Sequence, residues 1–236
     1  MIKEAIVLAG GFGTRLKSVV SDIPKPMAPV AGKPFLDYVL TYLQHHQIDH
    51  CILAVGHLRE QIISYFGSSF NGIRISYSEE ETPLGTGGGI KQACEYLNGD
   101  EAFVINGDTF FNVDLQELYH FHKQTNAKLS MALKPMTEFD RYGTVEIKNS
   151  GKVDAFLEKK YMPVGLINGG VYTLNKSIFS AIPESTFSFE KEVLERRVGD
   201  GIIYGLKVDK YFIDIGIPED YQQAQNDFAQ NIHEAQ

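Results

Sequence analysis

Apolar residues follow two alternating patterns along the first half of the chain. Short apolar runs, typical of buried strands, stand at Ala5–Ala9, Cys51–Val55, Ile73–Tyr77 and Ala102–Ile105. Between these runs, apolar residues recur at helical spacing over Pro34–His46, Leu58–Phe66 and Gly88–Leu97. Strands that alternate with helices build βαβ units, so we expect an α/β fold of Rossmann type, with a mainly parallel sheet and helices on both faces.

The pattern changes beyond residue 125. Apolar runs at Leu129–Leu133, Tyr142–Ile147, Val153–Leu157 and Leu166–Leu174 have few helices between them. These runs predict a small antiparallel or mixed extension of the sheet that could form the floor or lid of a pocket. A last helix is expected after Pro218, because proline is favoured in the first turn of a helix. With no repeat and no long linker, we expect a single domain over residues 1–236.

Composition and charge narrow the class of protein. The 236 residues include no apolar run near the roughly 18 residues of a membrane span, and the first residues lack the pattern of an export signal. We therefore expect a soluble cytoplasmic protein in which Cys51 and Cys94 are reduced core residues. The net charge of −8 gives no general attraction to nucleic acid or to an anionic membrane. Any phosphate must be held by a few local cations.

The histidines do not indicate a metal site. Their spacing is irregular, so solvated or capping roles are favoured over metal ligation for His45, His46, His50, His120 and His122.

Ligands of open α/β sheets bind at the carboxyl ends of the strands, where the strand order reverses. Four loops qualify by their position after a predicted strand: Gly10–Leu16, Thr82–Gly89, Asn106–Phe110 and Asp214–Pro218. We expect the site where these loops meet.

The first of these loops has the composition of a phosphate-binding turn. In "LAGGFGTRLKS", backbone amides at Gly10, Gly11 and Gly13 can surround an anion, and Arg15 adds a permanently charged fork. Leu16 replaces the glycine that both the dinucleotide fingerprint and the P-loop require, so the turn matches neither motif. It predicts a different kind of phosphate loop.

Two further stretches strengthen the case for a nucleotide. Lys25 lies between two prolines that stiffen its loop, and a second cation near a glycine-rich turn favours a polyphosphate ligand. The glycines of "PLGTGGGIKQA", from Gly85 to Gly89, could lie against a flat nucleobase or form a flexible loop ahead of a helix. The residues alone leave both interpretations open.

Two aspartates follow apolar strands and need a positive partner. Asp108 in "VINGDTFF" and Asp214 in "YFIDIGIPEDY" stand where uncompensated carboxylates are rare. If they converge, a divalent cation would turn their repulsion into attraction, and oxygen ligands without histidine or cysteine favour Mg²⁺ over zinc. The alternative is two helix-capping aspartates that never meet.

Six motifs occur in the order found in a known family. "LAGGFGTRL", "PKPM", "PLGTGGG", "NGD", "FLEKK" and "IDIGIPEDY" resemble the sugar-1-phosphate nucleotidyltransferases over about Lys3–Asp227. Through "LKSVVSDIPKPMAPVAGKPFL" and "NGDTFF", the chain is most similar to the D-glycero-D-manno-heptose 1-phosphate guanylyltransferases within that family. The resemblance implies the nucleotide-diphospho-sugar transferase fold. It also implies Mg²⁺-assisted, in-line transfer of a nucleoside monophosphate, expected from GTP, to a sugar 1-phosphate, which releases pyrophosphate.

The resemblance also implies roles for individual residues. Arg15 and Lys25 would be catalytic, and Asp108 and Asp214 would hold Mg²⁺. Nucleotide-binding residues would be Leu8, Gly10, Gly11, Gly13, Thr14, Gly85, Thr86 and Gly87. Sugar-phosphate-binding residues would be Gly143, Glu158, Lys159, Asn168 and Gly169. Many relatives have proline or a small residue where this chain has Lys160, which puts the role of Lys159 in doubt.

Several alternatives remain open on the sequence. UTP, dTTP or CTP could replace GTP, with a hexose 1-phosphate or mannose 1-phosphate as acceptor, and a non-catalytic nucleotide-binding regulatory module would keep the same fold. A hydride-transferring dehydrogenase is disfavoured because the third glycine of its fingerprint is missing. The expected partners are a nucleoside triphosphate and a sugar 1-phosphate, without nucleic acid or membrane, and a homo-oligomer is left open.

Overall fold

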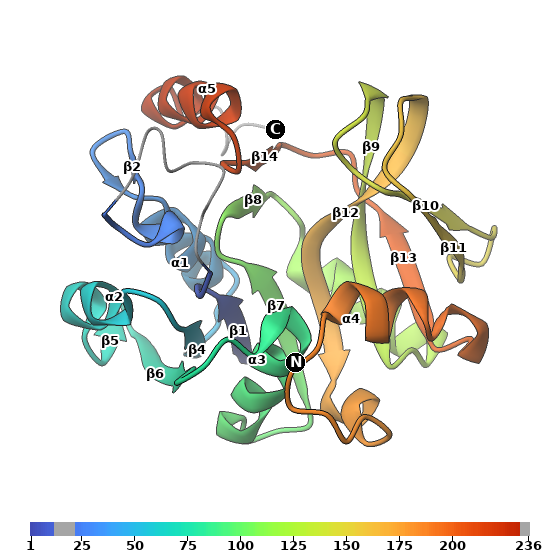
Figure 1. Cartoon of the computed structure of the whole chain (residues 1–236), viewed down its shortest axis with the longest axis horizontal. Helices are drawn as coiled ribbons and strands as arrows, with labels where there is room; N and C mark the ends of the chain where they lie inside the picture. Colours follow the sequence, from blue (N-terminus) through green and yellow to red (C-terminus); the bar gives the residue numbers. More distant parts are fainter. Residues whose placement is uncertain (12–21, 232–236) are drawn as a thin grey trace.

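The computed structural model describes residues 1–11 and 22–231, in which a central sheet carries helices on both faces (Figure 1). Its parallel half consists of β1 (Glu4–Leu8), β4 (His50–Val55), β6 (Ile73–Glu79) and β7 (Glu101–Asn106). Their order is β7-β1-β4-β6, with the short β5 (Ser69–Phe70) antiparallel at the edge. The predicted strands of the first half are confirmed.

The strand order reverses beside β1. The chain runs outward from β1 to β4 and β6 and then returns to β7 on the other side of β1. At this switch point the amide of Gly107 donates to the Leu8 carbonyl at 2.9 Å. A Cβ on Gly107 would lie 2.6 Å from that carbonyl oxygen, so only glycine allows the ends of β1 and β7 to come this close.

Two hydrophobic cores lie on opposite faces of the sheet. Along β1, the side chains of Ala5 and Val7 enter one core and that of Ile6 enters the other, as the period of a strand requires. The first core packs against α1 (Phe35–His45), α2 (Arg59–Phe66), α4 (Leu115–Thr125) and α5 (Pro218–Ala229). The second packs against α3 (Gly85–Ala93) and the π-helical turn η5 (Glu190–Glu195). Coverage of both faces is therefore confirmed.

The second half of the chain adds antiparallel strands to the edge formed by β7. The long β12 (Met162–Asn175) pairs with β7 and with β9 (Leu129–Phe139), and β10 (Thr144–Ile147) and β11 (Val153–Leu157) extend the sheet beyond it. Figure 1 shows these strands on the opposite side of β7 from β4 and β6. The predicted antiparallel extension is confirmed, and β13 (Ile203–Lys207), parallel to β9, was not predicted.

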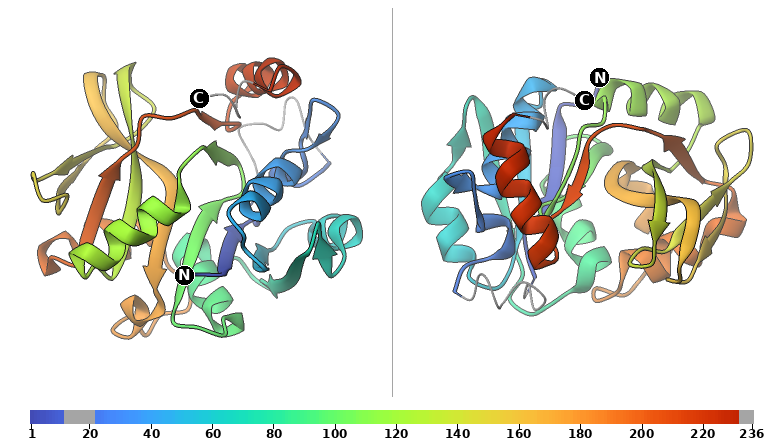
Figure 2. Two further views of the ribbon diagram at one scale, coloured as in Figure 1. Left: turned by 180° about the vertical axis from the view of Figure 1, so that it is seen from behind. Right: turned by 90° about the horizontal axis from the view of Figure 1, so that it is seen from above.

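Two small sheets and several short helical turns complete the chain. β8 (Thr109–Phe111) pairs with β14 (Phe212–Asp214), and β2 (Pro29–Val30) pairs with β3 (Lys33–Pro34). The other short turns are η2 (Lys25–Met27), η3 (Cys94–Tyr96), η4 (Lys176–Phe179) and η6 (Val198–Asp200). Figure 2 shows α5 beside α1, where the rings of Phe228 and Phe35 lie 5.7 Å apart.

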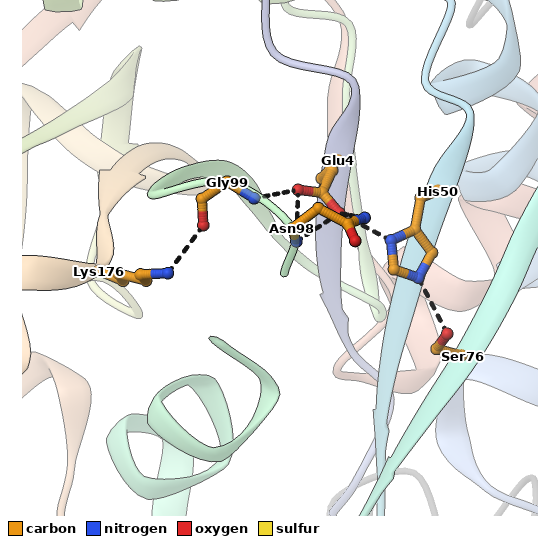
Figure 3. Close-up of polar contacts among 6 residues, drawn as sticks. All are labelled: Glu4, His50, Ser76, Asn98, Gly99 and Lys176. Carbon is orange, nitrogen blue, oxygen red and sulfur yellow. Dashed lines mark hydrogen bonds and ion pairs between the residues drawn. The ribbon is translucent and has the colours of Figure 1, made fainter. Parts of the chain in front are cut away.

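A buried polar cluster fastens the amino ends of the strands, opposite the switch point (Figure 3). The Glu4 carboxylate pairs with His50 Nδ1 at 2.8 Å and accepts the amide of Gly99 at 2.9 Å and that of Asn98. Burial opposes ionisation, but these hydrogen bonds hold the pKa of Glu4 below its usual value. His50 is 2% exposed, so the prediction of a solvated or capping role is wrong for this residue.

The two cysteines and His122 lie in the core. Cys51 and Cys94 are buried and free, as predicted, and burial raises the pKa of the Cys94 thiol to about 12. His122 is 1% exposed, and a solvated role is wrong for it too. Within residues 1–11 and 22–231, none of the helices has the length and apolar character to span a bilayer.

Candidate active site

The two aspartates lie together at the switch point. Asp108 follows β7 by two residues and precedes β8, while Asp214 is the last residue of β14. Because β8 and β14 are paired with Asp214 opposite Thr109, the carboxylates are neighbours, and Ile215 N donates to the Asp108 carbonyl at 3.0 Å. Residues far apart in sequence thus meet through a single antiparallel register.

Lys25 joins the two carboxylates. Its Nζ lies 2.6 Å from Asp108 Oδ2 and 3.5 Å from Asp214 Oδ1. The backbone around it is fixed, because Pro24 and Pro26 are buried and the amide of Ala28 donates to the Lys25 carbonyl at 3.0 Å. The lysine side chain is only 11% exposed, so its charge is directed at the carboxylates rather than at solvent.

The surroundings of Asp214 disfavour its charged form. Burial and the negative charge of Asp108 raise the pKa of Asp214, and the Lys25 ammonium partly opposes this rise. Its Oδ1 is buried and has no hydrogen-bond partner among the described residues. A Cβ on Gly216 would lie 2.9 Å from this oxygen and 3.2 Å from Lys25 Nζ, so the close contact depends on glycine. Such an oxygen is a ready ligand for a cation.

A pocket of about 560 Å³ lies at the carboxyl ends of β1 and β4, and Lys25, Asp108 and Asp214 are not among its lining residues. Its lining includes five of the residues predicted to bind the nucleotide: Leu8, Gly10, Gly11, Gly85 and Thr86. Glu60, Glu80 and Glu81 supply acidic groups to the same wall. The volume falls in the range of sites that bind small organic ligands.

The glycine-rich stretch is a helix rather than a loop. α3 begins at Gly85, three residues before the predicted start, and its glycines allow another segment to lie directly against the helix. A Cβ on Gly87 would lie 2.2 Å from the Phe187 ring, and one on Gly88 would lie 2.1 Å from the Ser185 carbonyl oxygen. Gly87 is buried and does not line the pocket, while the Thr86 hydroxyl donates to Glu190 at 2.8 Å.

The pocket wall that follows β4 was not among the predicted site residues. Leu58 there has a left-handed backbone, with φ +58°, and precedes α2. Arg59, the first residue of α2, connects this wall to the end of β6. Its side chain donates to the Glu80 carbonyl at 3.1 Å and pairs with Glu79 at 3.0 Å. The sequence signal was the predicted strand Cys51–Val55, because the loop after it is also at the carboxyl end of a parallel strand.

Three residues predicted to bind the sugar phosphate lie side by side in the extension. Thr144 pairs with both Leu157 and Ile167, so the preceding Gly143 lies next to Glu158 and Asn168, which follow those partners. Glu158 and Lys159 are exposed.

Asn168 and Gly169 make their contacts with other residues of the fold. Asn168 donates to the Tyr172 hydroxyl at 2.7 Å and accepts the Gly170 amide at 3.1 Å. Gly169 is buried, and a Cβ there would lie 2.3 Å from the Phe111 ring. Both residues therefore shape the bend of β12 next to β8.

Gly13, Thr14 and Arg15 lie outside the described residues, so their predicted roles stay predictions. No group of three or more His, Cys, Asp and Glu side chains in the described part of the chain is placed to hold a metal ion. A metal ion held only by Asp108 and Asp214 would have most of its coordination positions open to other oxygen ligands. Mg²⁺ is typically bound in this way, by one or two carboxylates together with substrate phosphates.

Comparison with known proteins gives consistent results. A family model described as nucleotidyl transferase matches residues 4–231. The chain is 50% identical over 230 residues to a D-glycero-alpha-D-manno-heptose 1-phosphate guanylyltransferase of Aneurinibacillus thermoaerophilus, with 97% of this chain and 100% of the relative covered. It is 48% identical over 219 residues to the protein of that name from Campylobacter jejuni, with 92% and 96% covered.

The fold comparison agrees with the sequence comparison. The crystal structure of HddC from Yersinia pseudotuberculosis complexed with GMP-PN is similar with a TM-score of 0.85 and 36% identity, over 96% of this chain and 100% of that chain. The predicted nucleotide-diphospho-sugar transferase fold is therefore confirmed.

Proposed function

This chain belongs to the nucleotidyl transferase family, and we propose that it transfers GMP from GTP to D-glycero-α-D-manno-heptose 1-phosphate with release of pyrophosphate. The family comprises enzymes that transfer a nucleoside monophosphate from a nucleoside triphosphate to a sugar 1-phosphate. The carrying observation is the meeting of Asp108, Asp214 and Lys25 between a ligand-sized pocket and the antiparallel extension.

The preference for guanine is supported by the acidic wall of the pocket. Guanine presents hydrogen-bond donors at N1 and N2, and Glu80 and Glu81 bring carboxylate acceptors to the pocket. One oxygen of Glu80 already accepts the Leu84 amide at 3.0 Å, which fixes its orientation. The names of the two relatives and the GMP-PN in the similar crystal structure point to the same base.

The reaction requires charge neutralisation more than proton transfer. A sugar phosphate is ionised at neutral pH, so one of its oxygens can attack the α-phosphorus without a general base. Lys25 is proposed to act on the phosphates around the reacting α-phosphorus, and Arg15 on the outer phosphates. Both residues would stabilise the charge that develops as pyrophosphate leaves.

We propose Mg²⁺ as the metal, in a family that generally uses a divalent metal ion. Asp108 and Asp214 would hold it, and the fit rests on two oxygen-only side chains and on the Oδ1 of Asp214, which is buried and accepts no hydrogen bond among the described residues. When bound, the ion would neutralise phosphate charge and fix the orientation of the phosphates.

The sugar phosphate is proposed to bind on the other side of Asp108. β7 lies between β1, which borders the pocket, and β12, which carries Asn168 and Gly169. Glu158 is proposed to accept hydrogen bonds from sugar hydroxyls, with Gly143 and Asn168 beside it and Lys159 on the phosphate. Asp108 at the end of β7 therefore lies between the two proposed substrates.

The first experiment is a substrate matrix. GTP, UTP, dTTP and CTP are each mixed with heptose, mannose and hexose 1-phosphates, and products are identified by mass. We expect GTP with the heptose 1-phosphate to give the fastest pyrophosphate release. A faster reaction with another pair would replace the substrates proposed here, and no reaction with any pair would favour a non-catalytic nucleotide-binding module.

A second experiment tests the two aspartates. Asp108→Asn and Asp214→Asn should each lower kcat by about 100-fold or more, because each removes a charge that would hold the metal. Asp154→Asn is the matched control, since Asp154 is exposed on β11 and pairs only with Lys148 in the described part of the chain. Near-normal turnover of either active-site variant would remove the metal assignment.

A further inference from the structure

The Lys25 ammonium stands between the two carboxylates that would bind the metal ion. It lies 2.6 Å from Asp108 Oδ2 and 3.5 Å from Asp214 Oδ1. In the part of the chain that the structure describes, it is the one basic group within 4.0 Å of either carboxylate. Arg141, whose charge also acts on Asp214, is itself paired with Asp220 at 2.8 Å.

An ammonium group and a divalent ion would need the same oxygens. A metal ion held by Asp108 Oδ2 and Asp214 Oδ1 would contact, at about 2.0–2.6 Å, the two oxygens that now face the Lys25 ammonium. Two cations at the same pair of oxygens also repel one another. A metal ion at these two oxygens therefore competes with Lys25 for them.

We propose, resting on the function proposed above, that Lys25 is a built-in counter-ion that competes with the divalent metal ion for Asp108 and Asp214. Without ligand, the ammonium compensates the two partly buried carboxylates and keeps them together. A nucleotide brings phosphate oxygens that give Lys25 another anionic partner. The metal ion therefore binds well together with the nucleotide and poorly alone.

The surroundings of Lys25 favour this exchange. The lysine backbone is fixed by two buried prolines, so the movement is confined to the flexible side chain. A hydrogen bond from the Gly216 backbone holds the Asp214 carboxylate, and Asp108 keeps a contact at 3.3 Å between its Oδ1 and the Thr109 hydroxyl. The carboxylates can thus remain in place when Lys25 leaves.

The test measures metal binding rather than turnover. Mn²⁺ is used as the probe, and free Mn²⁺ is measured by electron paramagnetic resonance with and without a non-hydrolysable GTP analogue. The wild-type chain should bind Mn²⁺ alone weakly and bind it much more tightly with the analogue. Lys25→Met should bind Mn²⁺ alone at least tenfold more tightly than the wild type, or about 1.4 kcal/mol.

Two further variants give matched controls. Lys25→Arg keeps the positive charge and should stay weak for Mn²⁺ alone, whereas Lys25→Gln removes the charge but keeps hydrogen-bond donors and should resemble Lys25→Met. If the neutral variants fold poorly, added Mn²⁺ should raise their melting temperature more than that of the wild type.

The possible results distinguish a failure of the competition from a failure of the metal site. Tight binding of Mn²⁺ alone by the wild type or by Lys25→Arg, or no gain in the neutral variants, overturns the competition. If Asp214→Asn still abolishes nucleotide-dependent Mn²⁺ binding in that case, the proposed metal site stands and only the competition fails. If Asp214→Asn and Asp108→Asn leave Mn²⁺ binding unchanged, the metal site itself is wrong.

Discussion

At the scale of single residues, the site depends on a glycine that carries no functional group. Gly216 is buried against both the Asp214 carboxylate and the Lys25 ammonium. A methyl group there would lie 2.9 Å from Asp214 Oδ1, which is closer than real Cβ contacts allow. The nearest atoms belong to the charged ends of the two side chains that are proposed to act in the reaction, and relief of the close contact would displace one of them.

We therefore expect Gly216→Ala to reduce kcat by about tenfold or more, since small displacements of catalytic groups are costly. The substitution should change the free energy of unfolding by less than it changes the activation free energy of the reaction. Activity and urea unfolding are measured side by side with Gly199→Ala, whose added Cβ meets no atom within 4 Å. Full activity in Gly216→Ala would show that the carboxylate contact tolerates displacement.

Glu4 lies away from the candidate site, and its contacts indicate a role in stability. Its carboxylate meets His50 and two backbone amides at the end of the sheet opposite the site. Glu4→Gln leaves these donors with a weaker acceptor and should lower the free energy of unfolding by about 1–3 kcal/mol at pH 7. Urea denaturation checks this against Glu195→Gln, an exposed glutamate. Equal stability of the two variants would contradict the role given to the cluster.

At the scale of elements, α3 shows why composition alone could not place the start of this helix. Glycines usually weaken a helix, so a run of them predicts a loop. Here the segment Ser185–Phe189 packs onto the helix backbone, and its tertiary contacts outweigh the low propensity. No local pattern reports which distant segment will do this, whereas alternating apolar runs did predict β1, β4 and β7.

The same packing supplies a prediction for α3. Gly88→Ala should gain helix propensity, about 1 kcal/mol, but its Cβ would lie 2.1 Å from the Ser185 carbonyl oxygen, so we expect a net loss of about 1–3 kcal/mol in unfolding free energy. Gly199→Ala, also in a helical turn but without neighbours, is the control. A more stable Gly88→Ala would mean that the segment moves away at little cost.

At the scale of the whole molecule, the candidate site could be predicted in its parts but not in its geometry. The rule that ligands bind at the carboxyl ends of strands in open α/β sheets led to the loops of Gly10, Asp108 and Asp214. That Asp214 meets Asp108 depends on the pairing of β8 with β14, which is a long-range contact between two three-residue strands. Strands this short carry too little pattern for their partner to be found from sequence.

Global stability should fall in mild acid because of a histidine held in its neutral form. His122 Nδ1 contacts the Ser130 hydroxyl at 3.0 Å, and its Nε2 is buried 3.9 Å from Glu101. Burial lowers the pKa of His122 from 6.5 to about 4, with Lys123 and Lys128 acting in the same direction and Glu101 opposing. Between these values the unfolded chain binds a proton that the folded chain does not, so stability falls as pH falls.

We expect the wild-type chain to lose up to about 3 kcal/mol of unfolding free energy between pH 7 and pH 4 from this residue. His122→Asn keeps a polar partner for Ser130 and removes the titration, so its loss over the same range should be smaller by that amount. Urea denaturation at half-unit pH steps measures both curves. Parallel curves would show that His122 is protonated in the folded chain and that Glu101 compensates its charge.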